Sequence, residues 1–88
     1  MPHIVEISPA AGRDLKRLLP TARDPIETAI YALADNPRPT NATKLVGAED
    51  QYRLRVGQFR VIYRILDRLR VVVVGRVVRR SETTYRNR

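Results

Sequence analysis

The spacing of apolar and polar positions changes once along this chain, from helical to strand-like. Residues 3–7 alternate and predict a short strand. Apolar residues then recur with helical spacing, first between Ser8 and Leu19 and again between Asp24 and Asn36. Each segment opens on a capping residue followed by proline, a combination typical of helix starts. Because only about four residues separate the two segments, we expect a helical hairpin.

A segment without clear periodicity, residues 38–51, follows the helices and contains Pro39 and Gly47. About fourteen residues is long for a connection in a compact domain, so we expect this segment to be either functional or partly mobile. From residue 52 onward the period is two, which predicts strands over 52–56, 59–66 and 69–78.

Two short connections join these strands. Gly57-Gln58 is typical of a two-residue hairpin turn with glycine first, and Asp67-Arg68 predicts a second tight turn. The expected fold is therefore α+β. An N-terminal strand and a helical hairpin precede a three-stranded antiparallel meander, and the helices pack on one face of the sheet. We expect residues 1–88 to form a single domain.

The Gly57-Gln58 turn sets the pairing of the first hairpin, with Val56 opposite Phe59 and Arg55 opposite Arg60. Directly opposed residues share one face of a sheet. The face toward the helices should carry Tyr52, Leu54, Val56, Phe59, Val61, Tyr63 and Ile65. The other face should carry Arg53, Arg55, Arg60 and Arg64.

The opposition of Arg55 and Arg60 is unfavourable by about 0.2–1 kcal/mol, because like charges face each other across the strands. Two interpretations remain. Either the pair meets an anion in the working protein, or both side chains extend into solvent, where salt screens them.

If Asp67-Arg68 is a two-residue turn, Arg60 pairs with Gly75. Glycine there either leaves a gap where a phosphate or base enters, or marks a bulge. Regular pairing would place Arg79 on the basic face and Arg80 on the core side. One bulge reverses this order.

Composition narrows the chemistry. Hydrophobic residues make up 43% of the 88 residues, there is no cysteine, and His3 is the single histidine. A disulfide framework, a thiol nucleophile and a cysteine-based zinc site are excluded, and a catalytic triad or a histidine metal cluster is nearly excluded. The longest aliphatic run is Val71–Val74, against about 20 residues for a membrane span. Without a signal-peptide pattern, a soluble cytoplasmic protein is expected.

The net charge of +8 is concentrated in the second half of the chain. Residues 51–88 contain eleven arginines and only two acidic residues. Arginine matches phosphate with a planar fork and stacks on bases, which lysine cannot do. High-GC codon usage could explain the ratio of arginine to lysine, but not this segregation. Nucleic acid is therefore the first candidate partner. In the basic tail, Tyr85 either stacks on a base or anchors the chain end.

Four stretches carry a family resemblance: KLVG at 44–47, YRLRVG at 52–57, FRVIYRI at 59–65 and RRSETTY at 79–85. Together with the expected element order, they resemble the RelE/ParE superfamily of bacterial toxins over nearly the whole chain. RelE members are ribosome-dependent mRNA endonucleases, whereas ParE members poison DNA gyrase. The resemblance favours the RelE branch, whose groove is a basic sheet face with a C-terminal aromatic residue.

The resemblance implies a role for each matching position. Arg55, Arg60, Arg80 and Tyr85 would be catalytic, with the arginines stabilising charge and Tyr85 stacking or transferring a proton. Arg79 would replace Arg80 if the register slips. Further RNA or phosphate contacts would come from Arg53, Arg64, Arg79 and Lys44. No metal or cofactor is implied.

The implied reaction is attack of the substrate's own 2′-hydroxyl on the adjacent phosphate. Arginine suits charge neutralisation but not proton removal, because its pKa exceeds about 12. RelE often has lysine where Arg53 and Arg55 stand, so Tyr85, Glu82 or ribosomal RNA is left as the base. The implied partners are a cognate antitoxin, in a hetero-oligomer, and the ribosome with mRNA in its A site. The alternatives are a ParE-like gyrase inhibitor and a catalytically silent RNA-binding protein.

Overall fold

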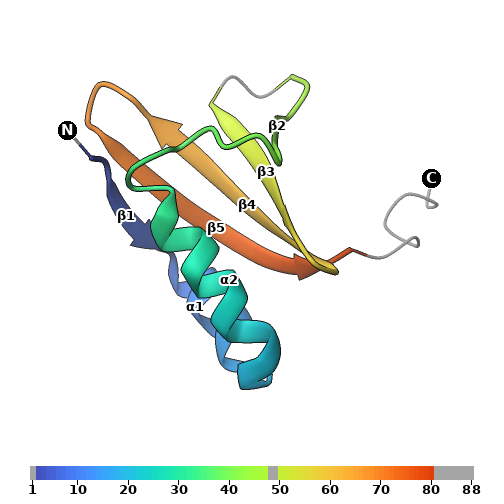
Figure 1. The fold of residues 1–88 in the computed structure, drawn as a ribbon. Coiled ribbons are helices and arrows are strands. Elements are labelled where there is room, and N and C mark those ends of the chain that lie inside the picture. The colour runs from blue at the N-terminus through green and yellow to red at the C-terminus, as the bar shows by residue number, and fades with distance from the viewer. Residues whose placement is uncertain (1, 48–49, 81–88) are drawn as a thin grey trace.

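The computed structural model describes residues 2–47 and 50–80, and its strands form one five-stranded sheet in the order β1-β5-β4-β3-β2 (Figure 1). β1 runs parallel to β5, and the other neighbouring strands are antiparallel. The elements are β1 (Ile4–Ile7), α1 (Pro9–Lys16), α2 (Pro20–Ala32), β2 (Ala42–Lys44), β3 (Gln51–Val56), β4 (Phe59–Leu66) and β5 (Val71–Arg79). The predicted α+β class is confirmed. The meander is widened by β2 on one edge and β1 on the other.

The start of the second helix was wrongly predicted. α2 begins at Pro20 rather than after Asp24, because Leu19 is extended and Pro20 occupies the first helical turn. Pro25 therefore lies inside α2. The helix ends at Ala32, somewhat before the expected stop. No helix within the described part of the chain is long and apolar enough to cross a membrane.

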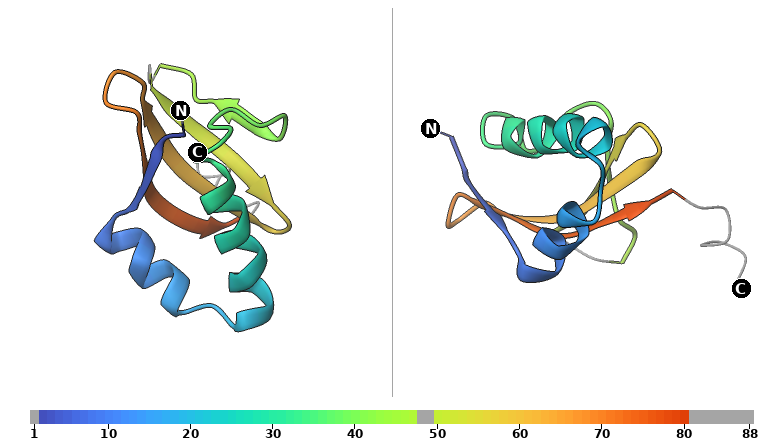
Figure 2. Two further views of the ribbon diagram at one scale, coloured as in Figure 1. Left: turned by 60° about the vertical axis from the view of Figure 1, so that its left-hand side comes forward. Right: turned by 90° about the horizontal axis from the view of Figure 1, so that it is seen from below.

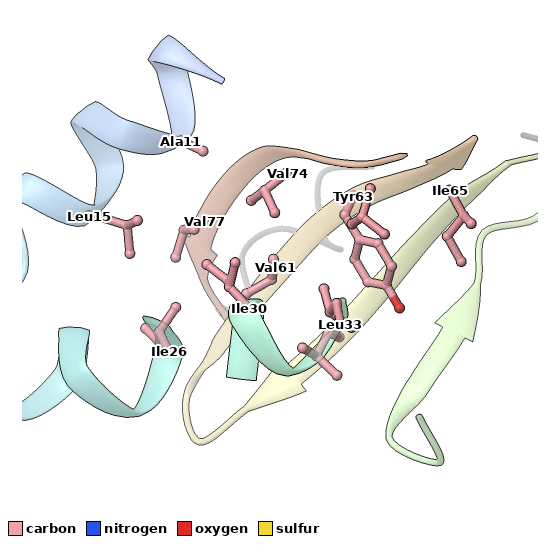
Figure 3. Close-up of a cluster of buried hydrophobic side chains, with 12 residues drawn as sticks. Ala11, Leu15, Ile26, Ile30, Leu33, Val61, Tyr63, Ile65, Val74 and Val77 are labelled. Carbon is pink, nitrogen blue, oxygen red and sulfur yellow. The ribbon is translucent and has the colours of Figure 1, made fainter. Parts of the chain in front are cut away.

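The hydrophobic core lies between the sheet and the two helices (Figure 3). α1 contacts β5, whereas α2 lies over β3 and β4 (Figure 2). The face of the first hairpin that was predicted to be apolar is confirmed, because Leu54, Val61, Tyr63 and Ile65 are buried. The helices contribute Ala11, Leu15, Ile26, Ile30 and Leu33.

Tyr63 joins the core to the segment that follows α2. Its side chain is 1% exposed, and its hydroxyl donates a hydrogen bond of 2.7 Å to the Pro37 carbonyl. Its ring stacks on Tyr52, with the ring centroids 5.7 Å apart. Burial raises the pKa of Tyr63 to about 12, so the hydroxyl stays protonated at neutral pH.

We expect Tyr63→Phe to lower the free energy of unfolding by about 1–1.5 kcal/mol, because it removes this partly buried hydrogen bond. Urea unfolding followed by circular dichroism measures the change. The matched control is Tyr31→Phe, which removes the hydroxyl of an exposed tyrosine. Equal stability of the two variants would contradict the prediction.

The connection between β4 and β5 differs from the prediction. The turn spans Asp67–Arg70, because Leu66 pairs with Val71, and Arg70 closes it with a φ of 56°. Arg60 pairs with Val78 rather than with Gly75. The register shifts between Ile62 and Tyr63 and leaves Gly75 as an extra residue, so the alternative of a bulge at Gly75 is the correct one.

Asp14 of α1 is a buried carboxylate at this bulge, with 8% of its surface exposed. It accepts hydrogen bonds from Arg76 Nε at 2.8 Å, from Arg76 Nη2 at 3.1 Å and from the Val77 N–H at 2.8 Å. The bonds from Arg76 hold the pKa of Asp14 below its usual 3.8, although burial opposes them. The ionised carboxylate therefore stabilises the folded state.

We expect Asp14→Asn to lower the free energy of unfolding by about 1.5–3 kcal/mol at neutral pH. The folded-state pKa lies below the unfolded value near 3.8, so the contribution of the carboxylate is complete above that pH. It is lost as the pH falls through the folded-state pKa, because the wild-type carboxyl is then protonated. Urea unfolding over this range should show the two stabilities converging. A constant difference would contradict the assignment.

Candidate nucleic-acid interface

Four arginines from three neighbouring segments lie on the sheet face away from the core. β3 and β4 pair as predicted, and Gly57 has the positive φ of 57° that the hairpin turn requires. Arg55 is therefore directly opposite Arg60. The β5 bulge puts Arg80 on the same face, where its N–H donates to the Gln58 carbonyl at 2.6 Å. We call Arg53, Arg55, Arg60 and Arg80 the basic face.

The pKa of Arg60 reflects the positive charges that surround it on this face. Burial lowers the pKa of Arg60, and the positive charges of Arg53, Arg80 and Arg55 lower it further. Each of those three guanidinium groups is thus close enough to act on Arg60. An anion bound among them would relieve this repulsion.

Three carboxylates in residues 2–47 and 50–80 pair with cations outside the basic face. Asp14 binds Arg76, Asp67 binds Arg38 at 2.7 Å, and Asp50 binds Arg64 at 2.8 Å. None of the ion pairs among these residues includes Arg53, Arg55 or Arg80. Within the described residues, no carboxylate therefore neutralises the charges of Arg53, Arg55 and Arg80.

A polar cavity of about 200 Å³ adjoins the basic face at the β2–β3 edge. Arg53 and Arg55 line it with Thr40, Asn41 and Thr43. The Asn41 amide donates a hydrogen bond of 2.9 Å to the Arg55 carbonyl and so links the segment before β2 to β3. Guanidinium and hydroxyl groups suit the phosphate and ribose of a nucleotide.

Sequence reasoning named Lys44 of β2 but missed Thr40, Asn41 and Thr43, which come from the same segment. Its signal is weak, because β2 is only three residues long and Pro39 breaks the pattern beside it. Thr43 lies beside the basic face because β2 pairs with β3 and places it opposite Arg53.

The other predicted residues are not among the four arginines of the basic face. Arg64 shares the face but is paired with Asp50. Arg79 lies over the Phe59 ring, 4.9 Å from its centroid, and donates to the Gln58 side chain at 3.2 Å. Lys44 is exposed and pairs in register with Tyr52. Tyr85 and Glu82 fall outside the described residues.

The comparisons with known proteins agree with this geometry. Residues 5–84 match the family model for the ParE toxin of the type II toxin–antitoxin system parDE. The chain is 35% identical over 86 residues to a Methanocaldococcus jannaschii protein that bears the toxin name RelE1, with 94% of each chain covered.

Solved structures of RelE–RelB complexes have the same fold. The archaeal complex from Pyrococcus horikoshii is 25% identical, with a TM-score of 0.83, and the match covers 93% of this chain and 99% of that one. The RelBE2 complex from Mycobacterium tuberculosis is 28% identical, with a TM-score of 0.80, and the match covers 91% and 100%. The chain therefore belongs to the RelE/ParE superfamily of type II toxin–antitoxin toxins, and these relatives support its RelE-like branch.

Proposed function

We propose that this protein is an mRNA endonuclease that acts in the ribosomal A site. The observation that carries the proposal is the convergence of Arg53, Arg55 and Arg80 on Arg60 without a carboxylate partner for these three in the described residues. Such a face supports binding of a sharply turned phosphodiester backbone. The relatives bear RelE toxin names, which supports the RelE-like branch whose activity the proposal adopts.

In the proposed reaction the 2′-oxygen attacks the adjacent phosphorus and the bond from phosphorus to the 5′-oxygen breaks. The products are a 2′,3′-cyclic phosphate and a 5′-hydroxyl. Arg55, Arg60 and Arg80 neutralise the additional negative charge of the phosphorane, while Arg53 contacts the backbone. Lys44, Arg64 and Arg79 are proposed for flanking phosphates.

Proton transfer falls to other groups. Arginine remains protonated in proteins and is unsuited to remove the 2′ proton. Tyr85, Glu82 or ribosomal RNA is proposed to accept it, and a protonated group returns a proton to the 5′-oxygen. We further propose that a cognate antitoxin covers the basic face and holds the toxin inactive.

The proposal is tested by inducing the wild-type chain in cells and mapping message ends by primer extension. Cuts inside translated codons are expected, and intact messages during growth arrest would contradict the nuclease function.

The second candidate is a ParE-like gyrase inhibitor, which the ParE family model favours. Trapped complexes of gyrase and cleaved DNA, with an SOS response, would identify that activity.

Arg80 and Arg79 provide a comparison between neighbouring residues. Arg80→Ala should slow RNA cleavage by about tenfold or more, because it removes a charge next to Arg60. Arg79→Ala should have a smaller effect, because Arg79 lies over Phe59. Single-turnover cleavage on programmed ribosomes measures both. A larger loss for Arg79→Ala would contradict the assigned register.

A further inference from the structure

The bulge in β5 decides which of two consecutive arginines joins the basic face. In a regular ladder without an extra residue, Arg79 would share the face of Arg60. With Gly75 as the extra residue, Arg60 pairs with Val78 and Arg80 takes that place. The position of Arg80 therefore depends on whatever holds the bulge.

Glycine itself is not what holds it. A Cβ atom at Gly75 would lie 3.6 Å from the Ile62 carbonyl oxygen, which is an ordinary van der Waals contact. Among the described glycines, positive φ angles occur at Gly47 and Gly57 and not at Gly75. Neither the space nor the backbone conformation requires glycine at this position.

The junction between β1 and α1 binds the bulged backbone instead. The Ser8 N–H donates to the Val74 carbonyl at 2.9 Å, and Ser8 Oγ donates to the Gly75 carbonyl at 2.9 Å. Consecutive carbonyls of a regular strand point to opposite edges. Ser8 therefore binds two consecutive carbonyls that share an edge only because the strand bulges.

Asp14 binds the other side of the bulge. It accepts from the N–H of Val77 and from two guanidinium nitrogens of Arg76. In the regular register Val77 would turn this N–H toward β4, away from Asp14. The buried carboxylate would then lose its backbone donor, so its position favours the bulged register.

We propose that Asp14 is a positioning residue for the basic face: with Ser8 it holds the β5 bulge, and the bulge places Arg80 rather than Arg79 beside Arg60. Burial of Val77 favours the same register. Asp14 adds the hydrogen bonds that keep the backbone beyond Gly75 in place. Only the RNA measurement below rests on the proposed function, because the register can be measured without RNA.

Disulfide trapping reads the register directly, since the chain has no cysteine of its own. In the full chain, Phe59→Cys with Arg79→Cys reports the bulged pairing, and Phe59→Cys with Val78→Cys reports the shifted one. We expect the bulged pair to cross-link much faster in the wild-type background. In Asp14→Ala, the ratio of the two rates should fall at least fivefold. An unchanged ratio would overturn the proposal.

Two further variants separate positioning from stability. Asp14→Asn keeps an acceptor for the Val77 N–H and should lower the ratio of the two cross-linking rates about twofold. If Asp14→Ala does not fold, an unchanged ratio in Asp14→Asn overturns the proposal. Asp24→Ala removes an exposed carboxylate of α2 and should leave the ratio unchanged. A fall as large as that in Asp14→Ala would mean that general destabilisation shifts the register, and would also overturn it.

Deletion of Gly75 supplies a rescue. Without the extra residue, Phe59 meets Arg79 in a regular ladder, so Asp14→Ala should no longer change the cross-linking ratio. A ratio that still falls fivefold would overturn the proposal. In the RNA measurement, Asp14→Ala should reduce cleavage about tenfold, and deletion of Gly75 should restore it. If the wild-type chain cleaves no RNA, the proposed function fails while the trapping result still decides the role of Asp14.

Discussion

Arg60→Ala is expected to slow RNA cleavage by at least about a hundredfold. Arg60 is the guanidinium on which the charges of Arg53, Arg80 and Arg55 act, so it lies where the attacked phosphate would bind. Removing one preorganised donor from a developing negative charge typically costs about 10²–10³ in rate. Single-turnover cleavage of mRNA on programmed ribosomes measures the loss.

Arg60→Lys separates the charge of this residue from its shape. Lysine keeps the positive charge but loses the planar fork that binds two phosphate oxygens. We expect its rate to lie between those of the wild type and the alanine variant. If lysine equals arginine, charge alone accounts for the role of Arg60.

The matched control is Arg68→Ala, which removes an exposed arginine from the turn between β4 and β5. It makes the same change in net charge at the opposite end of β4, and its cleavage rate should stay within about threefold of the wild type. Urea unfolding should place both alanine variants within about 1 kcal/mol of the wild type. A cleavage rate for Arg60→Ala close to that of the control would contradict the proposed role.

RNA affinity is expected to fall about 50-fold between 50 and 200 mM salt. Each phosphate contact to single-stranded nucleic acid adds about 0.7 to the slope of log affinity against log salt concentration, so four contacts give a slope near −2.8. The measurement uses a short RNA with 2′-O-methyl groups, which the protein cannot cleave by the proposed reaction. Fluorescence anisotropy over a salt series then reports binding alone.

Single variants test how the slope divides among the residues. Arg55→Ala should reduce the magnitude of the slope by about 0.7 and weaken binding similarly for all sequences, as expected for a phosphate contact. Arg23→Ala, on α2, changes the net charge equally and should leave the slope near the wild-type value, because its side chain binds the Leu18 carbonyl. Equal slopes for the two variants would show that binding follows net charge rather than the basic face.

The turn and register of the first hairpin, between β3 and β4, could be predicted from the sequence because they depend on local residues. Gly57-Gln58 permits one tight turn, and the alternation on either side permits one register, so Arg55 could be placed opposite Arg60. The same reasoning placed Leu54 and Val61 in the core. These predictions hold because each depends on residues that are close in sequence.

The second hairpin shows where such reasoning fails. The turn after β4 contains four residues rather than two, and the bulge at Gly75 adds one more to β5. The bulge depends on distant contacts, because Ser8 and Asp14 bind it from the other end of the chain. The choice between Arg79 and Arg80 therefore could not be made from spacing.

The ion-pair partners of individual arginines could be identified only from the tertiary structure, for the same reason. Residues 51–88 carry a uniform excess of arginine, yet Arg64 and Arg76 are paired with carboxylates from outside or from the edge of that segment. Composition and alternation alone were sufficient for the fold class, the first register and the existence of a basic sheet face. Packing between distant elements decided which arginines converge. Ion pairs join residues that are far apart in sequence, so they produce no periodic pattern from which they could be predicted.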